Sequence, residues 1–271
     1  MPTPAPNPNT FDALDDFEHR ELTFLGQTKV VHVAGTGTGP AVIVMSEMPG
    51  IYSLVGRFAR WVRDAGFTVW MPHLFGEDGR PLSIGYGLSS MVRGCISREF
   101  RAFAANASSP VIDWLRQLAA HAHPLCGGRG VGAIGMCFTG NFALSLMLEP
   151  AVVAPVLCQP SLPIGQKGGM HIAPAEVATV KARLEKDDLT VLAYRFAGDA
   201  FCRAERFAAY EEALGDRFVG RVLPDASAHP NAPMKNPHSV VTNHLIDREG
   251  EPTRQAVEEI LGFFRTRLIG A

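Results

Sequence analysis

Short runs of apolar residues recur along the chain, and segments with a mixed, helix-like pattern separate them. The run at Val131–Ile134 is too short for a helix and suits a buried strand. Similar runs predict further strands, and the full set is Glu21–Leu25, Lys29–Val33, Ala41–Ser46, Thr68–Met71, Val131–Gly135, Ala151–Cys158, Leu189–Phe196 and Phe218–Leu223.

Between these strands the apolar positions recur at helical spacing. The segment from Pro110 to His121 is the clearest, because Val111, Leu115 and Leu118 fall on one face. Helices are expected at Ser53–Ala65, Ser97–Ala105, Pro110–His121, Asn141–Leu148, Pro174–Glu185, Ala200–Leu214 and Thr253–Leu268. Loops rich in Gly and Pro are expected at Pro72–Gly94, Pro160–Pro174 and from Pro224 to about Val240. The alternation predicts an α/β fold with a mostly parallel sheet and helices on both faces.

Composition narrows the class of protein. The 271 residues, of which 46% are hydrophobic, are enough for one large core, so a single domain is expected over residues 21–271, after a flexible Pro-rich arm at 1–20. The net charge is −2 without a basic stripe, which argues against nucleic-acid or membrane partners and leaves a small molecule as the expected one. The Gly-rich segment at Gly35–Pro40 precedes a strand rather than a helix, so it is no phosphate-binding turn.

The chain has five widely spaced cysteines, and no two of them form a C-x-x-C motif: Cys95, Cys126, Cys137, Cys158 and Cys202. A disulfide framework or zinc site is therefore not expected, and a reducing cytoplasm fits best. We expect neither a metal nor a cofactor. The odd number of cysteines leaves room for one functional thiol.

Cys137 lies where a predicted strand turns directly into a predicted helix. Its surroundings, GMCFTG at Gly135–Gly140, place small residues on both sides of the turn, as close strand–helix packing requires. This is the logic of the nucleophile elbow, usually written G-x-S-x-G. Such a turn exposes the apex side chain and is expected to aim a helix N-terminus at it, which would favour a thiolate. A buried structural cysteine is the alternative.

Other reactive side chains follow the carboxyl ends of further predicted strands, the edge where active sites of such sheets lie. Glu47 follows the strand at Ala41–Ser46, Asp199 follows Leu189–Phe196, and the loop after Phe218–Leu223 holds histidines. The chain order is therefore nucleophile, acid, base, as in the α/β-hydrolases. Asp225 is the alternative acid, and His229 and His244 are the alternatives to His238 as base.

These segments resemble the dienelactone hydrolases, α/β-hydrolase-fold enzymes with a cysteine nucleophile. The resemblance runs from about residue 20 to 268 and is carried by SEMPG at Ser46–Gly50, GMCFTG at Gly135–Gly140, AGD at Ala197–Asp199 and PHS at Pro237–Ser239. It implies a hydrolase of carboxylic esters or lactones.

The resemblance also implies roles for individual residues. Cys137 would be the nucleophile, His238 the base and Asp199 the acid that orients it. The backbone N–H groups of Met48 and Phe138 would form the oxyanion hole. Glu47 would lie beside the resting thiol and control its ionisation.

This chain departs from the family pattern at two positions. Thr139 stands where the elbow usually has Gly, and we expect it to shape the pocket. Thr242 stands where the family has a substrate-binding arginine, four residues past the histidine. A second family arginine corresponds to Arg93 or Arg98, and these two, with Ser239, are the candidate substrate contacts.

Two other functions compete with the thiol hydrolase. A non-catalytic binding protein on the same fold would keep the pocket without turnover, although no expected triad position carries an inert residue. A redox protein would need a resolving cysteine, for which Cys158 is the candidate. A phosphoester side activity is compatible with the same thiolate and oxyanion donors.

Overall fold

One eight-stranded sheet runs through the molecule and brings together segments that are far apart in sequence. The structure, a computed structural model, describes residues 10–35 and 37–270. Its strands are β1 (Glu18–Phe24), β2 (Gln27–Ala34), β3 (Ala41–Met45), β4 (Thr68–Pro72), β5 (Val131–Met136), β6 (Val152–Cys158), β7 (Val191–Phe196) and β8 (Phe218–Leu223). The spatial order is β1-β2-β4-β3-β5-β6-β7-β8. The six strands from β4 to β8 in this order pair in parallel, whereas β1–β2 and β2–β4 are antiparallel.

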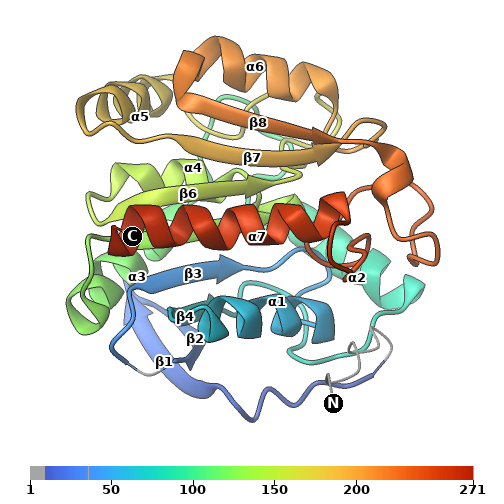
Figure 1. The fold of residues 1–271 in the computed structure, drawn as a ribbon, viewed down its shortest axis with the longest axis horizontal. Helices are drawn as coiled ribbons and strands as arrows, with labels where there is room; N and C mark the ends of the chain where they lie inside the picture. The colour runs from blue at the N-terminus through green and yellow to red at the C-terminus, as the bar shows by residue number, and fades with distance from the viewer. Residues whose placement is uncertain (1–9, 36, 271) are drawn as a thin grey trace.

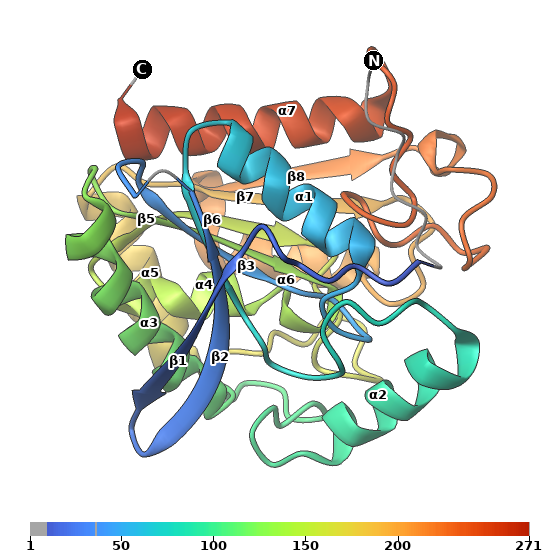
Figure 2. The same ribbon diagram turned by 90° about the horizontal axis from the view of Figure 1, so that it is seen from below.

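Helices cover both faces of the sheet. They are α1 (Ser53–Asp64), α2 (Ile84–Ile96), α3 (Val111–Cys126), α4 (Phe142–Ser145), α5 (Pro174–Lys186), α6 (Ala204–Leu214) and α7 (Pro252–Phe264). Figures 1 and 2 show α1 and α7 on one face, α3 to α6 on the other, and α2 beyond the carboxyl ends of the strands. None of these helices combines the length and apolar character that crossing a bilayer requires.

The alternation of side chains along the strands explains the two layers. On β3, Val42 and Val44 belong to the core under α1 and α7, whereas Ile43 and Met45 belong to the core on the opposite face. All four are fully buried, which is why the strand forms a continuous apolar run in the sequence. The predicted α/β architecture and mostly parallel sheet are confirmed.

The region between β4 and α3 differs from the prediction. A helix was expected at Ser97–Ala105 and a loop before it, but the helix is α2, whose first turn is capped by the Ser83 hydroxyl. Three glycines within α2 disguise it in the sequence, because glycine disfavours helices. The positive φ of Arg101 breaks any helix in the expected segment.

The expected N-terminal arm is also shorter than predicted. Of the residues assigned to it, 1–9 lie outside the described part, but Leu14 and Phe17 are buried against the α1 face and β1 begins at Glu18. Asp12 and Asp16 bind the guanidinium of Arg60 on α1. These contacts tie residues 10–17 to α1 and to the core beneath it, so this part is not a free arm.

Candidate active site

Cys137 occupies a strained turn directly after β5. Its φ of 53° lies in the left-handed region that non-glycine residues rarely adopt. The turn requires glycine nearby, because a Cβ on Gly135 would lie 2.1 Å from the Thr139 carbonyl oxygen. A Cβ on Gly140 would lie 2.5 Å from the Cα of Pro160. The small residues that indicated an elbow are thus sterically necessary.

The segment after the turn is not the regular helix that was expected at Asn141–Leu148. A 3₁₀ turn covers Cys137–Thr139, α4 has four residues, and a second 3₁₀ turn comes after it at Leu146–Leu148. So short a helix sums few peptide dipoles. The expected helix-dipole stabilisation of a thiolate therefore has little structural basis here.

Thr139 does not shape the pocket. Its fully buried hydroxyl accepts from the Met136 N–H at 3.0 Å and lies 3.0 and 3.1 Å from the carbonyl oxygens of Met45 and Ser46. The threonine therefore joins the ends of β5 and β3. Its side chain fixes the elbow against the strand that precedes Glu47.

His238 and Asp199 form a buried pair beside the thiol. His238 Nδ1 and Asp199 Oδ2 are 2.7 Å apart, and each residue is 3% exposed. The other carboxylate oxygen of Asp199 accepts from the N–H groups of Phe201 and Cys202 at 2.8 and 3.0 Å. One oxygen of Asp199 thus binds the backbone N–H groups that follow it in the chain, while the other oxygen fixes the orientation of the imidazole.

The alternative acid and bases lie elsewhere. Asp225 is exposed and accepts from the Gly198 N–H at 2.7 Å. His244 is buried, and its Nδ1 accepts from the N–H groups of His238 and Ser239 at 3.3 and 3.1 Å. His229 Nδ1 accepts from the Asn231 N–H at 3.2 Å in its own loop. Asp225, His244 and His229 thus accept hydrogen bonds from backbone N–H groups of the loops around the Asp199–His238 pair, and none of these bonds involves the Cys137 thiol.

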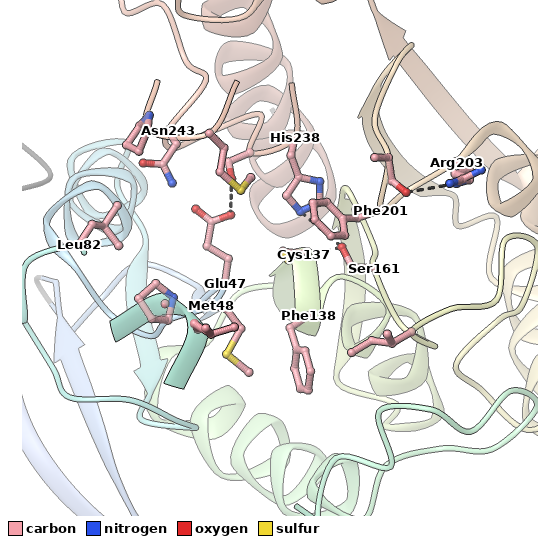
Figure 3. Close-up of a pocket in the computed structure, with 18 of the residues that line it drawn as sticks. Glu47, Met48, Leu82, Cys137, Phe138, Ser161, Phe201, Arg203, His238 and Asn243 are labelled. Carbon is pink, nitrogen blue, oxygen red and sulfur yellow. Dashed lines mark hydrogen bonds between the residues drawn. The ribbon is translucent and has the colours of Figure 1, made fainter. Parts of the chain in front are cut away.

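The charge state of His238 depends on its neighbours. Burial by itself would lower the pKa of His238, but the nearby Cys137 thiolate and the Asp199 carboxylate outweigh burial and raise it well above the ordinary value. Both the thiol and the imidazole line one cavity (Figure 3). This arrangement favours the charged form of the His238 imidazole.

Ser161 is a part of the site that was not predicted from the sequence. Its hydroxyl oxygen lies 3.4 Å from Cys137 Sγ and 3.4 Å from His238 Nε2, and Figure 3 shows Ser161 next to these two residues. The residue lies in the loop after β6, within a Gly- and Pro-rich segment. The sequence held one signal for Ser161: it follows the end of a predicted parallel strand, where active-site residues of such sheets lie.

Glu47 lines the cavity together with Cys137, and its carboxylate accepts hydrogen bonds from side chains of other residues. It is 1% exposed, and its carboxylate accepts hydrogen bonds from Tyr52 Oη (2.5 Å), Ser239 Oγ (2.8 Å), Gln159 Nε2 (3.4 Å) and Thr242 Oγ1. The expected contact with resting Cys137 is not among these bonds. Ser239 was expected to bind substrate, and it does line the cavity. Its hydroxyl, however, donates its hydrogen bond to Glu47.

The cavity has a volume of about 660 Å³, and Met48 and Phe138 line it, as the expected oxyanion donors should. Most of its wall is apolar, with Pro49, Leu82, Leu88, Ile164, Phe201, Pro233 and Met234 among the lining residues.

The geometry gives no support to the expected arginine contacts, because Arg93 and Arg98 are exposed and are not among the residues that line the cavity. The cationic residues that line it are instead Lys167, Arg203 and Arg206. Within the described residues, no group of three His, Cys, Asp or Glu side chains is placed to hold a metal ion.

A mostly parallel sheet covered on both faces, with the reactive side chains at its carboxyl edge, defines the chain as an α/β-hydrolase-fold protein. A sequence profile of the dienelactone hydrolase family matches residues 28–167, just over half of the 271 residues. The chain therefore belongs to the dienelactone hydrolase family, and it is a hydrolase of the ester and lactone class.

Solved structures agree on the fold. A protein assigned as a dienelactone hydrolase from Klebsiella pneumoniae subsp. pneumoniae MGH 78578 is 17% identical, with a TM-score of 0.62 over 92% of this chain and 97% of that one. The dienelactone hydrolase-like promiscuous phosphotriesterase P91 from metagenomic libraries is 19% identical, with a TM-score of 0.60 over 91% and 96%. Dienelactone hydrolase from Anabaena variabilis ATCC 29413 is 15% identical, with a TM-score of 0.56 over 93% and 99%. A comparison with curated proteins gives no match.

Proposed function

We propose that this protein hydrolyses carboxylic esters or lactones through a Cys137–His238–Asp199 triad and an acyl-enzyme on Cys137. The observation that carries the proposal is the buried Asp199–His238 pair, 2.7 Å apart, beside a cysteine held at a strained turn in the wall of a large cavity. A purely structural cysteine would not need an imidazole–carboxylate pair next to it.

Acylation would begin with the thiolate of Cys137. The sulfur attacks the carbonyl carbon, a C–S bond forms, and the carbonyl oxygen takes the negative charge. When the C–O bond breaks, the His238 imidazolium gives its proton to the leaving alkoxide. Asp199 keeps the imidazole in the tautomer that this transfer needs.

Deacylation would use the same imidazole as a base. His238 Nε2 takes a proton from water, the hydroxide attacks the thioester, and the C–S bond breaks to release the carboxylic acid and the thiolate. The N–H groups of Met48 and Phe138 are our candidates for stabilising the oxyanion in both steps. Such a donor is worth about 3–4 kcal/mol to a transition state.

The mostly apolar lining of the cavity supports a largely apolar substrate, and the cationic groups in its wall are Lys167, Arg203 and Arg206. Thr242 directs its hydroxyl to Glu47, so this position supplies no cation for a substrate carboxylate. We also propose a phosphoester side activity, supported by the similarity to the promiscuous phosphotriesterase. A tetrahedral phosphorus centre would meet the same thiolate and oxyanion donors.

The redox alternative has less support. Cys158 is fully buried on β6, and burial raises the pKa of its thiol well above the ordinary value, which disfavours a resolving thiolate. All five cysteines are free. We retain the proposal of a cytoplasmic protein on the basis of its cysteine usage.

The test is hydrolysis of p-nitrophenyl acetate and butyrate by wild type, Cys137→Ala and His238→Ala, with folding checked by circular dichroism. We expect both folded variants to lose at least about a hundredfold in rate, or about 3 kcal/mol. An inactive wild type whose Cys137 is still labelled by iodoacetamide would favour the non-catalytic binding protein. A Cys137→Ala variant as active as wild type would show that the elbow is structural.

A further inference from the structure

Ser161 touches both reacting groups of the proposed site, yet the triad mechanism gives it no role. Its Oγ lies 3.4 Å from Cys137 Sγ, 3.4 Å from His238 Nε2 and 3.1 Å from the carbonyl oxygen of Gln159. The residue is partly buried and lines the cavity. A serine at this place can therefore act on the thiol, on the imidazole, or on both.

The backbone around Ser161 is held from several sides. The Ser161 N–H donates to the Cys137 carbonyl oxygen at 2.9 Å. Arg206, which is 1% exposed, donates to the carbonyl oxygens of Pro160 at 3.2 Å and of Leu162, the residues on either side. Gly140 packs so closely on Pro160 that it has no room for a Cβ. The loop is thus fixed while the hydroxyl remains free to rotate, an arrangement that preorganises a functional group.

The single hydroxyl proton can serve only one acceptor at a time. The acceptors in reach are the Cys137 sulfur, the Gln159 carbonyl oxygen and, when the imidazole is neutral, His238 Nε2. A thiolate is charged and attracts the donor strongly, whereas an acylated sulfur is neutral and a weak acceptor. The preferred partner of the hydroxyl therefore changes with the state of the sulfur.

We propose that Ser161 is a further catalytic residue that stabilises the Cys137 thiolate, chiefly as the leaving group in deacylation. In the resting pair the hydroxyl donates to the thiolate. While the sulfur carries the acyl group, the hydroxyl turns to the Gln159 carbonyl oxygen, which is nearer than His238 Nε2, and leaves that nitrogen to deprotonate the hydrolytic water. As the C–S bond breaks, the hydroxyl donates again to the departing thiolate. This inference rests on the proposed thiol hydrolase.

The two half-reactions should respond differently to the loss of this hydroxyl. In acylation the thiolate is the reactant, so its stabilisation increases its population but weakens its attack, and the two effects offset each other. In deacylation the thiolate is the product, and a lost hydrogen bond to the developing charge only raises the barrier. Hydrogen bonds to charged groups are strong enough for about a tenfold effect in this step.

The experiment compares wild type with Ser161→Ala, Ser161→Thr and Ser89→Ala by stopped-flow hydrolysis of p-nitrophenyl acetate. Acid-quenched samples are weighed by intact-protein mass spectrometry to give the fraction of acyl-enzyme. Ser89 is the matched control, because its hydroxyl donates to the Tyr86 carbonyl oxygen on exposed α2, outside the cavity lining. Thermal unfolding and iodoacetamide titration of Cys137 check that each variant is folded.

For Ser161→Ala we expect deacylation to slow about tenfold, acylation to change less than about threefold, and acyl-enzyme to accumulate. Ser161→Thr keeps a hydroxyl and should resemble wild type, as should Ser89→Ala. Unchanged deacylation in Ser161→Ala, or equal slowing of both steps, would overturn the inference. Ser161→Gly replaces the alanine variant if that one does not fold. A wild type that forms no acyl-enzyme on Cys137 would instead refute the proposed function.

Discussion

The Thr242 hydroxyl donates a hydrogen bond to the Glu47 carboxylate, at the position where the family carries a substrate-binding arginine. The same carboxylate accepts from Tyr52 at the start of α1 and from Ser239 beside His238. One buried carboxyl group thus joins the loop of the expected oxyanion donor Met48 to the loop of the expected base. All four of its hydrogen-bond donors are neutral, so Glu47 positions these loops through hydrogen bonds alone.

Thr242→Val should lower the free energy of unfolding. The substitution keeps the size of the side chain but leaves the 1% exposed Glu47 carboxylate with one donor fewer, which costs about 1–3 kcal/mol. Urea denaturation of both proteins measures the difference. Thr179→Val is the matched control, because its hydroxyl donates to the Ala175 carbonyl oxygen on an exposed helix surface. Equal effects of the two substitutions would show that Glu47 does not depend on Thr242.

Asp199→Asn should reduce activity far more than stability. The amide keeps the shape of the side chain but removes the charge and the acceptor that hold the His238 tautomer, which in such triads costs about 10⁴ in rate. Asp225→Ala should cost much less, since Asp225 is exposed and bonds only the Gly198 N–H among its described contacts. The measurement is the rate of ester hydrolysis by the two variants and wild type, and circular dichroism checks that each variant is folded. A large loss from Asp225→Ala with none from Asp199→Asn would reverse the assignment of the acid.

The fold was predictable because strands such as β3, β4, β5 and β7 are buried along their whole length, so each forms an apolar run in the sequence. The strand at Phe218–Leu223 was predicted to the residue. The steric demands of the elbow also appear in the sequence as Gly135 and Gly140. These features depend on local sequence, and local patterns indicate them directly.

The rest of the site depends on contacts between loops. Nothing near Thr242 in sequence reveals that it faces Glu47, 195 residues away, and the hydroxyl of Ser161 is meaningful only because Arg206 fixes its loop. The helix α2 was missed because tertiary contacts, such as those of buried Tyr86, override its glycines. Arg93 lies on this helix, and neither Arg93 nor Arg98 lines the cavity.

The charge on His238 should depend on Cys137. Because the thiolate is the main influence that raises the pKa of His238 against the effect of burial, its removal in Cys137→Ala should lower that pKa. NMR titration of histidine-labelled wild type and Cys137→Ala follows the imidazole signal. His238→Gln identifies the resonance. An equal pKa in both proteins would mean that Asp199 alone sets the charge of the imidazole.

His171 should make the protein less stable at mildly acidic pH. Burial, aided by the positive charges of Arg206 and Arg101, lowers its pKa from 6.5 to about 4. Between these two values the unfolded chain binds more protons than the folded one, so stability falls as the pH falls from 6.5 to 4. The total loss from this group is about 3 kcal/mol.

His171→Gln removes this titration, and the variant should therefore lose less stability than wild type between pH 7 and pH 5, in urea denaturation at each pH. Its stability at pH 7 should already be lower, because glutamine cannot reproduce the contacts of the imidazole with Ser109 and the Ala104 carbonyl oxygen. The informative quantity is thus the slope of stability against pH, with partly exposed His123→Gln as the control. Parallel slopes for wild type and His171→Gln would show that His171 becomes protonated without unfolding, which its buried contacts should prevent.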